Sequence, residues 1–253
     1  MSKTLNDLTL HMNKYKDAII LLGPGAIPSF KQERVSLEDR HLYFTKKFQR
    51  TEPDKFLDFF LENFYQNPNE ISLSYAQDSA LNLKYLGIVS QIIDLNGDGL
   101  MNVKAVVENI IELHGSMTKF TCDKLGCRRK YNYDEIIEND TYKTKTCSCG
   151  AYIKPDVLLS GNTYDQNRFD LVKHLIATTH TLITVGIDYS EDPILNLIQE
   201  YDVIRKVDPS EKRYLVAIFN KDLGFDVNDI AFHDFISERD PAEALDIICA
   251  SLK

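Results

Sequence analysis

Four of the five cysteines form two close pairs in the sequence. Cys122 and Cys127 are separated by four residues, and Cys147 and Cys149 are separated by one. Two pairs joined by a loop can bring four thiolates to the corners of a tetrahedron, the geometry of structural zinc. The alternative is four unrelated buried thiols, since the second pair is closer than zinc ligands usually are. A metal held by four protein ligands keeps no open position, so the pattern predicts a structural zinc site.

A histidine and a glycine turn are the other candidates for chemistry. His114 stands in the segment ELHGS, just before the cysteines, and histidine can exchange protons near neutral pH. A lone histidine is nevertheless more often structural than catalytic. Gly23 and Gly25 follow an apolar run, where glycines let a dinucleotide pyrophosphate approach the backbone. A tight turn between strand and helix also favours glycine, and Pro24 removes one amide donor.

Short apolar runs alternate with amphipathic segments along the chain. The runs predicted as buried strands are 17–23, 87–94, 181–187 and 214–220, with a weaker candidate at 202–207. The predicted helices are 78–84, 103–111, 168–179 and 193–201. This alternation predicts an α/β fold with a mostly parallel sheet covered on both faces. Ligands of such sheets bind beyond the carboxyl ends of the strands, where Gly23, Asp94, Gly186 and Asn220 stand.

Two insertions interrupt the alternation. Residues 29–76 form an expected helical insertion with an aromatic segment at 56–65, a pattern typical of core packing. Residues 115–154 carry the paired cysteines and form the expected zinc-binding ribbon. The remaining segments, 1–28, 77–114 and 155–253, are expected to make up one large domain.

The chain is acidic, with 29 Lys and Arg against 38 Asp and Glu and a net charge of −9. Because phosphate binding depends on an excess of basic residues, nucleic acid is not an expected partner. The run Arg128-Arg129-Lys130 is interpreted as a solvated, charge-balancing turn, with a phosphate-binding patch as the alternative. No apolar stretch is long enough for a membrane span. Clustered cysteines without a secretory signal predict a cytoplasmic protein.

The order of these motifs resembles the sirtuins, the NAD-dependent protein deacylases, over nearly the whole chain. The glycine turn and an aromatic helix are followed by a strand ending in Gln91-x-x-Asp94, then by ELHGS, the cysteines and CG-x-x-x-K-P-D-V. The part from ELHGS onward is the specific one. The resemblance implies a Rossmann-like parallel sheet with helices on both faces, plus a small lobe containing a zinc ribbon and a helical insertion. The acyl-lysine of a protein or peptide substrate would meet NAD between the two.

The resemblance also implies roles for individual residues. In the family, the acyl oxygen attacks the anomeric carbon of the NAD ribose and expels nicotinamide. A histidine matching His114 is the general base on a ribose hydroxyl. Contacts with the cofactor are implied for Gly23, Gly25, Phe30, Gln91, Asp94, Gly186 and Asn220, and contacts with the substrate peptide for Val157 and Gly161.

The sequence departs from the sirtuin pattern around the nucleotide. The first loop is several residues shorter, with Ser29 and Lys31 where the family has Asp and Arg. Ile92 replaces an asparagine and therefore offers no hydrogen bond. Asp188 and Ser160 stand where the family has a serine and a phenylalanine. We therefore expect NAD-dependent lysine deacylation or a related ADP-ribosyl transfer, weak or redirected. The alternative is an inactive homologue that binds a nucleotide, such as ADP-ribose, or a protein.

Overall fold

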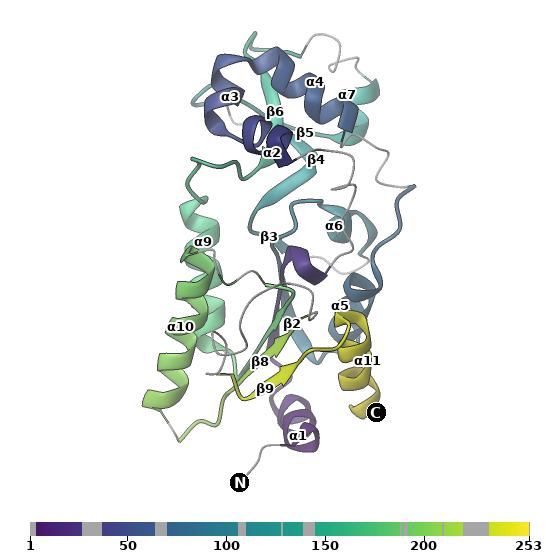
Figure 1. The fold of residues 1–253 in the computed structure, drawn as a ribbon, viewed down its shortest axis with the longest axis vertical. Helices are drawn as coiled ribbons and strands as arrows, with labels where there is room; N and C mark the ends of the chain where they lie inside the picture. Colours follow the sequence, from purple (N-terminus) through teal and green to yellow (C-terminus); the bar gives the residue numbers. More distant parts are fainter. Residues whose placement is uncertain are drawn as a thin grey trace.

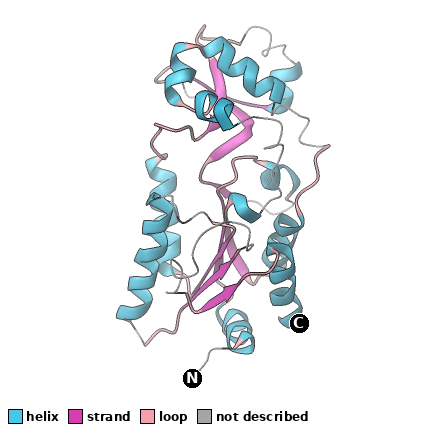
Figure 2. Ribbon diagram, viewed as in Figure 1, coloured by secondary structure: helices cyan, strands magenta, loops and turns pink. Residues whose placement is uncertain are grey.

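Six parallel strands form the larger of two sheets in the computed structural model (Figure 1; Figure 2). Their bounds are β1 Ala18–Leu22, β2 Val89–Asp94, β3 Ile110–Glu112, β7 Thr181–Val185, β8 Tyr214–Ile218 and β9 Phe235–Ser237. The order β3-β2-β1-β7-β8-β9 places the first strand centrally, with the chain winding outward on both sides, as in the doubly wound dinucleotide-binding fold. The structure describes residues 4–26, 37–63, 70–105, 110–127, 129–138, 145–187, 189, 192–208, 210–219 and 233–252.

Helices cover both faces of this sheet. Their bounds are α1 Leu5–Tyr15, α5 Tyr75–Tyr85, α6 Leu100–Lys104, α9 Gln166–Thr178, α10 Asp192–Val207 and α11 Pro241–Ser251. Side chains alternate along a strand, so Ile20 and Leu22 of β1 pack with α1, α5 and α11, whereas Ile19 and Leu21 pack with α9 and α10. Figure 1 shows α9 and α10 on one side of the strands and α5 and α11 on the other. The predicted fold class is thereby confirmed.

A second sheet of three antiparallel strands, in the order β5-β4-β6, lies beyond the carboxyl end of the first (Figure 1). Its strands are β4 Gly115–Cys122, β5 Lys130–Asn132 and β6 Ile153–Val157. The helices beside it are α2 Leu37–Tyr43, α3 Lys46–Thr51, α4 Pro53–Asn63 and α7 Tyr133–Glu138. We call these strands and helices the small lobe. Leu57 of α4 packs on Phe120 and Ile153 of the sheet, and Phe56 and Phe60 are buried beside it, so the described part of the aromatic segment is core, as predicted.

Two predicted elements are wrong. Residues 202–207 are not a strand but the end of α10, where Asp202 pairs with Arg205 and Lys206. Only a helix brings side chains three and four positions apart together in this way. Residues 103–111 are not one helix, since α6 ends at Lys104 and β3 begins at Ile110. Short apolar runs do not distinguish a strand from a helix, and pairing with β2 decides the outcome here.

The expected domain boundaries stay predictions, and β6 crosses the one at residue 155. In the described part of the chain, no helix is both long enough and apolar enough to cross a membrane.

Candidate active site and metal centre

Four cysteine sulfurs converge in the small lobe. The sulfurs of Cys122, Cys127, Cys147 and Cys149 all lie within 4.8 Å of one another. The Cys122–Cys149 pair is 3.5 Å apart and the Cys127–Cys147 pair is 3.8 Å apart. Zinc–thiolate bonds of about 2.3 Å place the sulfurs of a regular tetrahedron about 3.8 Å apart. The cluster therefore fits a structural zinc ion held by the two predicted cysteine pairs.

Hydrogen bonds from the protein also reach these sulfurs. The backbone amide of Lys124 donates to Cys122 Sγ at 3.4 Å, and the hydroxyl of Tyr131 donates to Cys147 Sγ at 3.1 Å. Such donors offset the charge of four thiolates around a divalent ion. Tyr131 lies in β5, outside both cysteine segments, so the cysteine spacing gave no sign of its role.

Several lysines that lie near the cysteines in the sequence pair with carboxylates. These ion pairs are Lys119 with Glu112 at 2.5 Å, Lys130 with Asp156 at 3.4 Å and Lys145 with Asp58 at 2.7 Å. Arg128, part of the predicted charge-balancing turn, lies outside the described residues.

His114 lies where the chain crosses from the large sheet to the small one. β3 ends at Glu112 and β4 begins at Gly115, so only two residues make the crossing. The amide of Leu158, just after β6, donates to the carbonyl oxygen of His114 at 2.8 Å. Gly115 has a φ of 80°, and a Cβ there would lie 1.9 Å from the Asp156 carbonyl oxygen. Only glycine fits this approach, and the backbone on both sides of His114 is therefore fixed.

The hydroxyl of Tyr164 lies 3.0 Å from Nε2 of His114. Asp165 caps α9 by accepting a hydrogen bond from the amide of Arg168 at 2.9 Å. Tyr164 precedes this cap and packs on Phe169, with ring centroids 5.1 Å apart. This pairing is a hydrophobic staple, which fixes the direction in which the chain enters a helix. The staple is readable from the sequence, but the contact with His114 is not, and our sequence analysis missed Tyr164.

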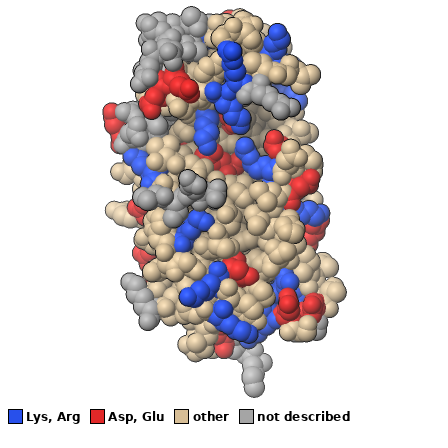
Figure 3. Space-filling view, turned by 180° about the vertical axis from the view of Figure 1, so that it is seen from behind, with Lys and Arg blue, Asp and Glu red and all other residues tan. Residues whose placement is uncertain are grey.

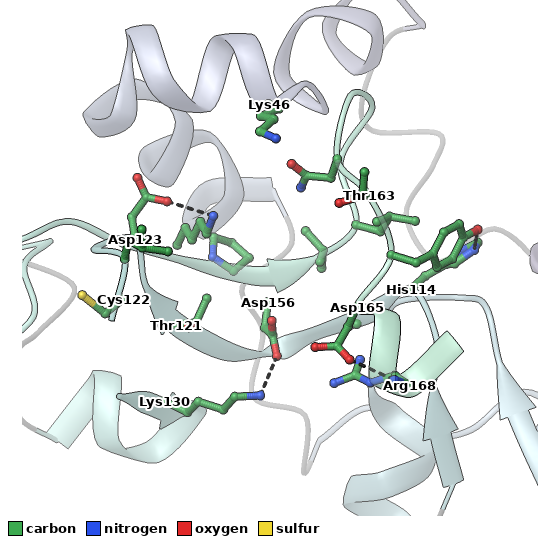
Figure 4. Close-up of a pocket in the computed structure, with 18 of the residues that line it drawn as sticks. Lys46, His114, Thr121, Cys122, Asp123, Lys130, Asp156, Thr163, Asp165 and Arg168 are labelled. Carbon is green, nitrogen blue, oxygen red and sulfur yellow. Dashed lines mark hydrogen bonds and ion pairs between the residues drawn. The ribbon is translucent and has the colours of Figure 1, made fainter. Parts of the chain in front are cut away.

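A cavity of about 650 Å³ lies beside His114 (Figure 4). Its walls come from α3, from the turn after Cys122, from β6 and from the segment that leads into α9. We call it the lobe cavity. Of the described candidate residues, His114, Val157 and Cys122 line the lobe cavity. Its lining does not include Gly23, Gly25, Gln91, Asp94 or Gly186.

The loop between β6 and α9 is attached to the small lobe by its backbone. The amide of Lys46 donates to the Ser160 carbonyl oxygen at 3.0 Å, and the amide of Ser160 donates to the Phe44 carbonyl oxygen at 2.9 Å. Gly161, with a φ of 84°, follows this clamp, and Val157 packs against the aromatic cluster of α4. The two residues expected to flank a substrate peptide are thus held beside α3.

The predicted glycines meet at the carboxyl edge of the large sheet. The amide of Gly25 donates to the Gly186 carbonyl oxygen at 2.9 Å. A Cβ at Gly186 would lie 2.0 Å from the backbone nitrogen of Ala26, so the approach requires glycine. The amides of Gly23, Gly25 and Ala26 all donate to protein carbonyls, and Pro24 has no amide hydrogen. Packing of the two chain segments therefore accounts for these glycines without a phosphate.

The neighbouring candidates on β2 are mostly buried. Gln91 is half-buried, and its side-chain amide donates to the Ile92 carbonyl oxygen at 3.2 Å. Ile92 is fully buried in the core beside β1 and β3, so the position that lacks the family's amide is filled by apolar packing. Phe30 and Asn220, also expected to contact the cofactor, lie outside the described residues.

Asp94 ends β2 as a fully buried carboxyl group. Its Oδ1 accepts hydrogen bonds from the backbone and side-chain nitrogens of Asn96 at 2.9 and 2.5 Å. Among the described residues, no donor hydrogen-bonds to its buried Oδ2. Burial, together with the nearby carboxyl groups of Asp98 and Glu112, raises the pKa of Asp94 to about 7. An unpartnered buried acceptor at the ligand-binding edge of the sheet suits a donor such as a carboxamide or a hydroxyl.

We expect the free energy of unfolding of Asp94→Asn, taken relative to wild type at the same pH, to be higher at pH 8 than at pH 5.5. With a raised folded pKa, wild type binds more protons than its unfolded chain between about pH 4 and pH 7, so its stability falls across that window. Asparagine does not titrate, so the free energy of unfolding of the variant does not fall across this window. The stability difference between variant and wild type should grow by on the order of 2 kcal/mol from pH 5.5 to pH 8. Urea unfolding at both values measures it, and a pH-independent difference would contradict the assignment.

Comparisons with a family model, with known sequences and with solved structures all lead to the same family. A model of the Sir2 family matches residues 29–191. The NAD-dependent protein deacetylase of Listeria monocytogenes serotype 4b (strain F2365) is 26% identical over 204 residues, covering 76% of this chain and 83% of that protein.

Solved structures share the fold along the full length. One, described as the structural basis for the mechanism and regulation of Sir2 enzymes, matches with a TM-score of 0.75 at 22% identity, covering 100% of this chain and 98% of that one. Another, described as Sir2 bound to acetylated peptide, matches with a TM-score of 0.73 at 18% identity, covering 99% and 100%.

Proposed function

The chain belongs to the Sir2 family, and from that membership we propose that it removes acyl groups from protein lysines with NAD as co-substrate. The observation that carries the proposal is the position of His114, on the wall of the lobe cavity between the parallel sheet and the cysteine cluster. The relative from Listeria monocytogenes bears the name of an NAD-dependent deacetylase, and a structure of the same fold binds an acetylated peptide. These two names support NAD as the proposed co-substrate and an acylated peptide as the proposed substrate class.

In the proposed reaction His114 is the general base. NAD, when bound, supplies a ribosyl carbon whose bond to nicotinamide breaks as the acyl oxygen attacks. The imidazole of His114 takes the proton of a ribose hydroxyl. General base catalysis of this kind raises the rate by about 10²–10⁴-fold. Tyr164 is the positioning residue, because its hydroxyl can accept a hydrogen bond from Nε2–H of His114. With Nδ1 as the atom that takes up the proton, this hydrogen bond is the same in the neutral and in the protonated ring. The ring therefore keeps its orientation before and after proton uptake.

One described feature suits NAD at the large sheet, since the buried Oδ2 of Asp94 has no hydrogen-bond partner among the described residues and can accept from a ligand donor. The amides of Gly23, Gly25 and Ala26 are already engaged, however. Together with the apolar Ile92, this favours a second candidate, a non-catalytic module that binds ADP-ribose or protein.

Two measurements separate the candidates. Isothermal titration with NAD and with ADP-ribose tests nucleotide binding, and nicotinamide release in the presence of an acetyl-lysine peptide tests turnover. An enzyme binds NAD and releases nicotinamide only when the peptide is present. Binding of ADP-ribose without any release identifies the non-catalytic module, and a lack of both binding and release overturns the proposal.

We expect Tyr164→Phe to lower kcat by roughly threefold to tenfold, the usual worth of one hydrogen bond. The phenyl ring keeps the staple with Phe169, so thermal stability and the KM for the peptide should stay as in wild type. Tyr164→Ala is the matched control, since it also removes the staple and should lower the unfolding temperature. Steady-state kinetics with thermal unfolding measure both effects. An unchanged kcat in Tyr164→Phe would rule out the positioning role.

A further inference from the structure

The lobe cavity is basic although the chain is acidic. Six cationic side chains but only three carboxylates line it, while the whole chain carries a net charge of −9. The cations are Lys46, Arg50, Lys124, Lys130, Lys154 and Arg168, and the carboxylates are Asp123, Asp156 and Asp165. Figure 3 shows Lys and Arg side chains over the small lobe as well as over the lower part of the molecule, so the excess of cations is a property of the residues that line the lobe cavity. Clefts lined by one sign of charge concentrate ligands of the opposite sign.

Two of the six cations are neutralised inside the lobe cavity. Lys154 pairs with Asp123 at 2.8 Å and Lys130 pairs with Asp156 at 3.4 Å. Figure 4 marks both pairs along the β4–β6 sheet. Asp165, the third carboxylate, accepts a backbone hydrogen bond as the cap of α9. The excess positive charge therefore belongs to the remaining four cations.

Those four cations have no carboxylate partner among the described residues. Arg168 donates to the carbonyl oxygen of Glu112 at 2.6 Å and keeps its full charge. For Lys46, Arg50 and Lys124 the described part of the chain provides no ion pair at all. A cavity left with unpaired cations is suited to an anionic ligand.

Helix stability does not explain why Lys46 and Arg50 stand together on α3, although Arg50 by itself suits the last turn of the helix. They stand four residues apart on α3, where like charges face one another and disfavour the helix. Lys46 also begins the helix, where a cation is unfavourable. Yet the backbone clamp with Ser160 holds Lys46 at the cavity wall, and Figure 4 shows its side chain directed toward the loop that contains Thr163. The positions of Lys46 and Arg50 therefore suit the binding of a ligand better than they suit the stability of α3.

We propose that the lobe cavity binds carboxylate side chains flanking the acyl-lysine, so that the preferred substrate is an acidic peptide segment. The link to acyl-lysine rests on the proposed function, since His114 lines the same cavity. The unpaired cations come from α3, from the turn between Cys122 and Cys127, and from α9. Because they are spread over three separate elements, an extended chain with several carboxylates matches them better than one small anion.

The test uses fluorescein-labelled acetyl-lysine peptides of equal length whose flanking residues are Glu, Gln or Lys. Fluorescence anisotropy with the full chain, without NAD, should show the Glu peptide binding about tenfold more tightly than the Gln peptide at low salt. The Lys peptide should bind most weakly, and the differences should shrink as salt screens the charges. Equal affinities for the three peptides would overturn the proposal.

A pair of double variants locates the effect. Lys46→Gln with Arg50→Gln removes two of the unpaired cations and should abolish most of the preference for Glu. Lys47→Gln with Lys55→Gln is the matched control, since it makes the same charge change on α3 and α4 at residues that do not line the lobe cavity. The control should keep the preference. Equal losses in both double variants would show that only net charge matters and would refute the site.

Two further ligands test whether the lobe cavity prefers a negative charge from another source, either the acyl group or a nucleic acid. A succinyl-lysine peptide with Gln flanks tests whether the carboxylate belongs on the acyl group, and tighter binding of this peptide than of the Glu-flanked acetyl peptide would reject the flank assignment. A DNA oligonucleotide that binds more tightly than the Glu peptide would also reject it. Because binding is measured without turnover, a preference for Glu with no nicotinamide release would leave this inference standing while the proposed function fails.

Discussion

Cys147→Ala is expected to release the metal and unfold the small lobe. Cys147 is 2% exposed, packs with Phe120 and Ile153, and accepts a hydrogen bond from Tyr131. Removing one of four ligands leaves three thiolates and a vacant coordination position. Binding of structural zinc contributes roughly 10–16 kcal/mol in small zinc domains, so losing most of that contribution exceeds what the small hydrophobic cluster around Leu57 can offset.

Elemental analysis and thermal unfolding measure this result. Wild type should contain one zinc per chain, and Cys147→Ala well under one, with a lower unfolding temperature and a tendency to aggregate. Cys249→Ala is the matched control, because this half-buried cysteine packs in the large domain, away from the cluster. It should keep the metal. A well-folded wild type with much less than one zinc per chain would refute the metal centre.

His114→Ala is expected to reduce nicotinamide release by about 10²–10⁴-fold, the usual contribution of a positioned general base. NAD and peptide should still bind, because the substitution leaves the carboxyl edge of the large sheet and the cations of the lobe cavity intact. Stability should change little, since the side chain is half-buried and the crossing it occupies is held by backbone contacts of Gly115 and Leu158.

His174→Ala is the control for this experiment, since His174 is exposed on α9 and does not line the lobe cavity. Its nicotinamide release should match wild type. If wild type itself releases no nicotinamide with any acyl peptide, the non-catalytic candidate is favoured. If wild type turns over and His114→Ala is equally fast, His114 is not the base.

Much of the fold follows from local patterns in the sequence. The apolar runs at 17–23, 87–94, 181–187 and 214–220 contain four of the six strands of the large sheet. They were recognisable because strands buried on both faces are continuously apolar. β3 and β9 are three residues long, too short for any periodicity to mark them. Residues 202–207 were assigned wrongly because a short β-branched run also suits one face of a helix.

The metal centre was also accessible from the sequence. Cysteine pairs require only spacing to be recognised, and the structure brings the four predicted sulfurs together. The glycines were identified as well, but their physical reason came from tertiary structure. Gly25 and Gly186, more than a hundred residues apart, approach because neighbouring parallel strands end at the same edge.

The sequence alone therefore determined four strands of the large sheet, the cysteine pairs and the family resemblance, because each depends on residues close together in the chain. The tertiary structure alone decided which side chains meet around His114. Tyr164 reaches its ring from fifty residues away, and Lys46 reaches the lobe cavity through a backbone clamp with Ser160. No local periodicity encodes such contacts, since they arise only when packing of the two sheets brings their connecting segments to one place.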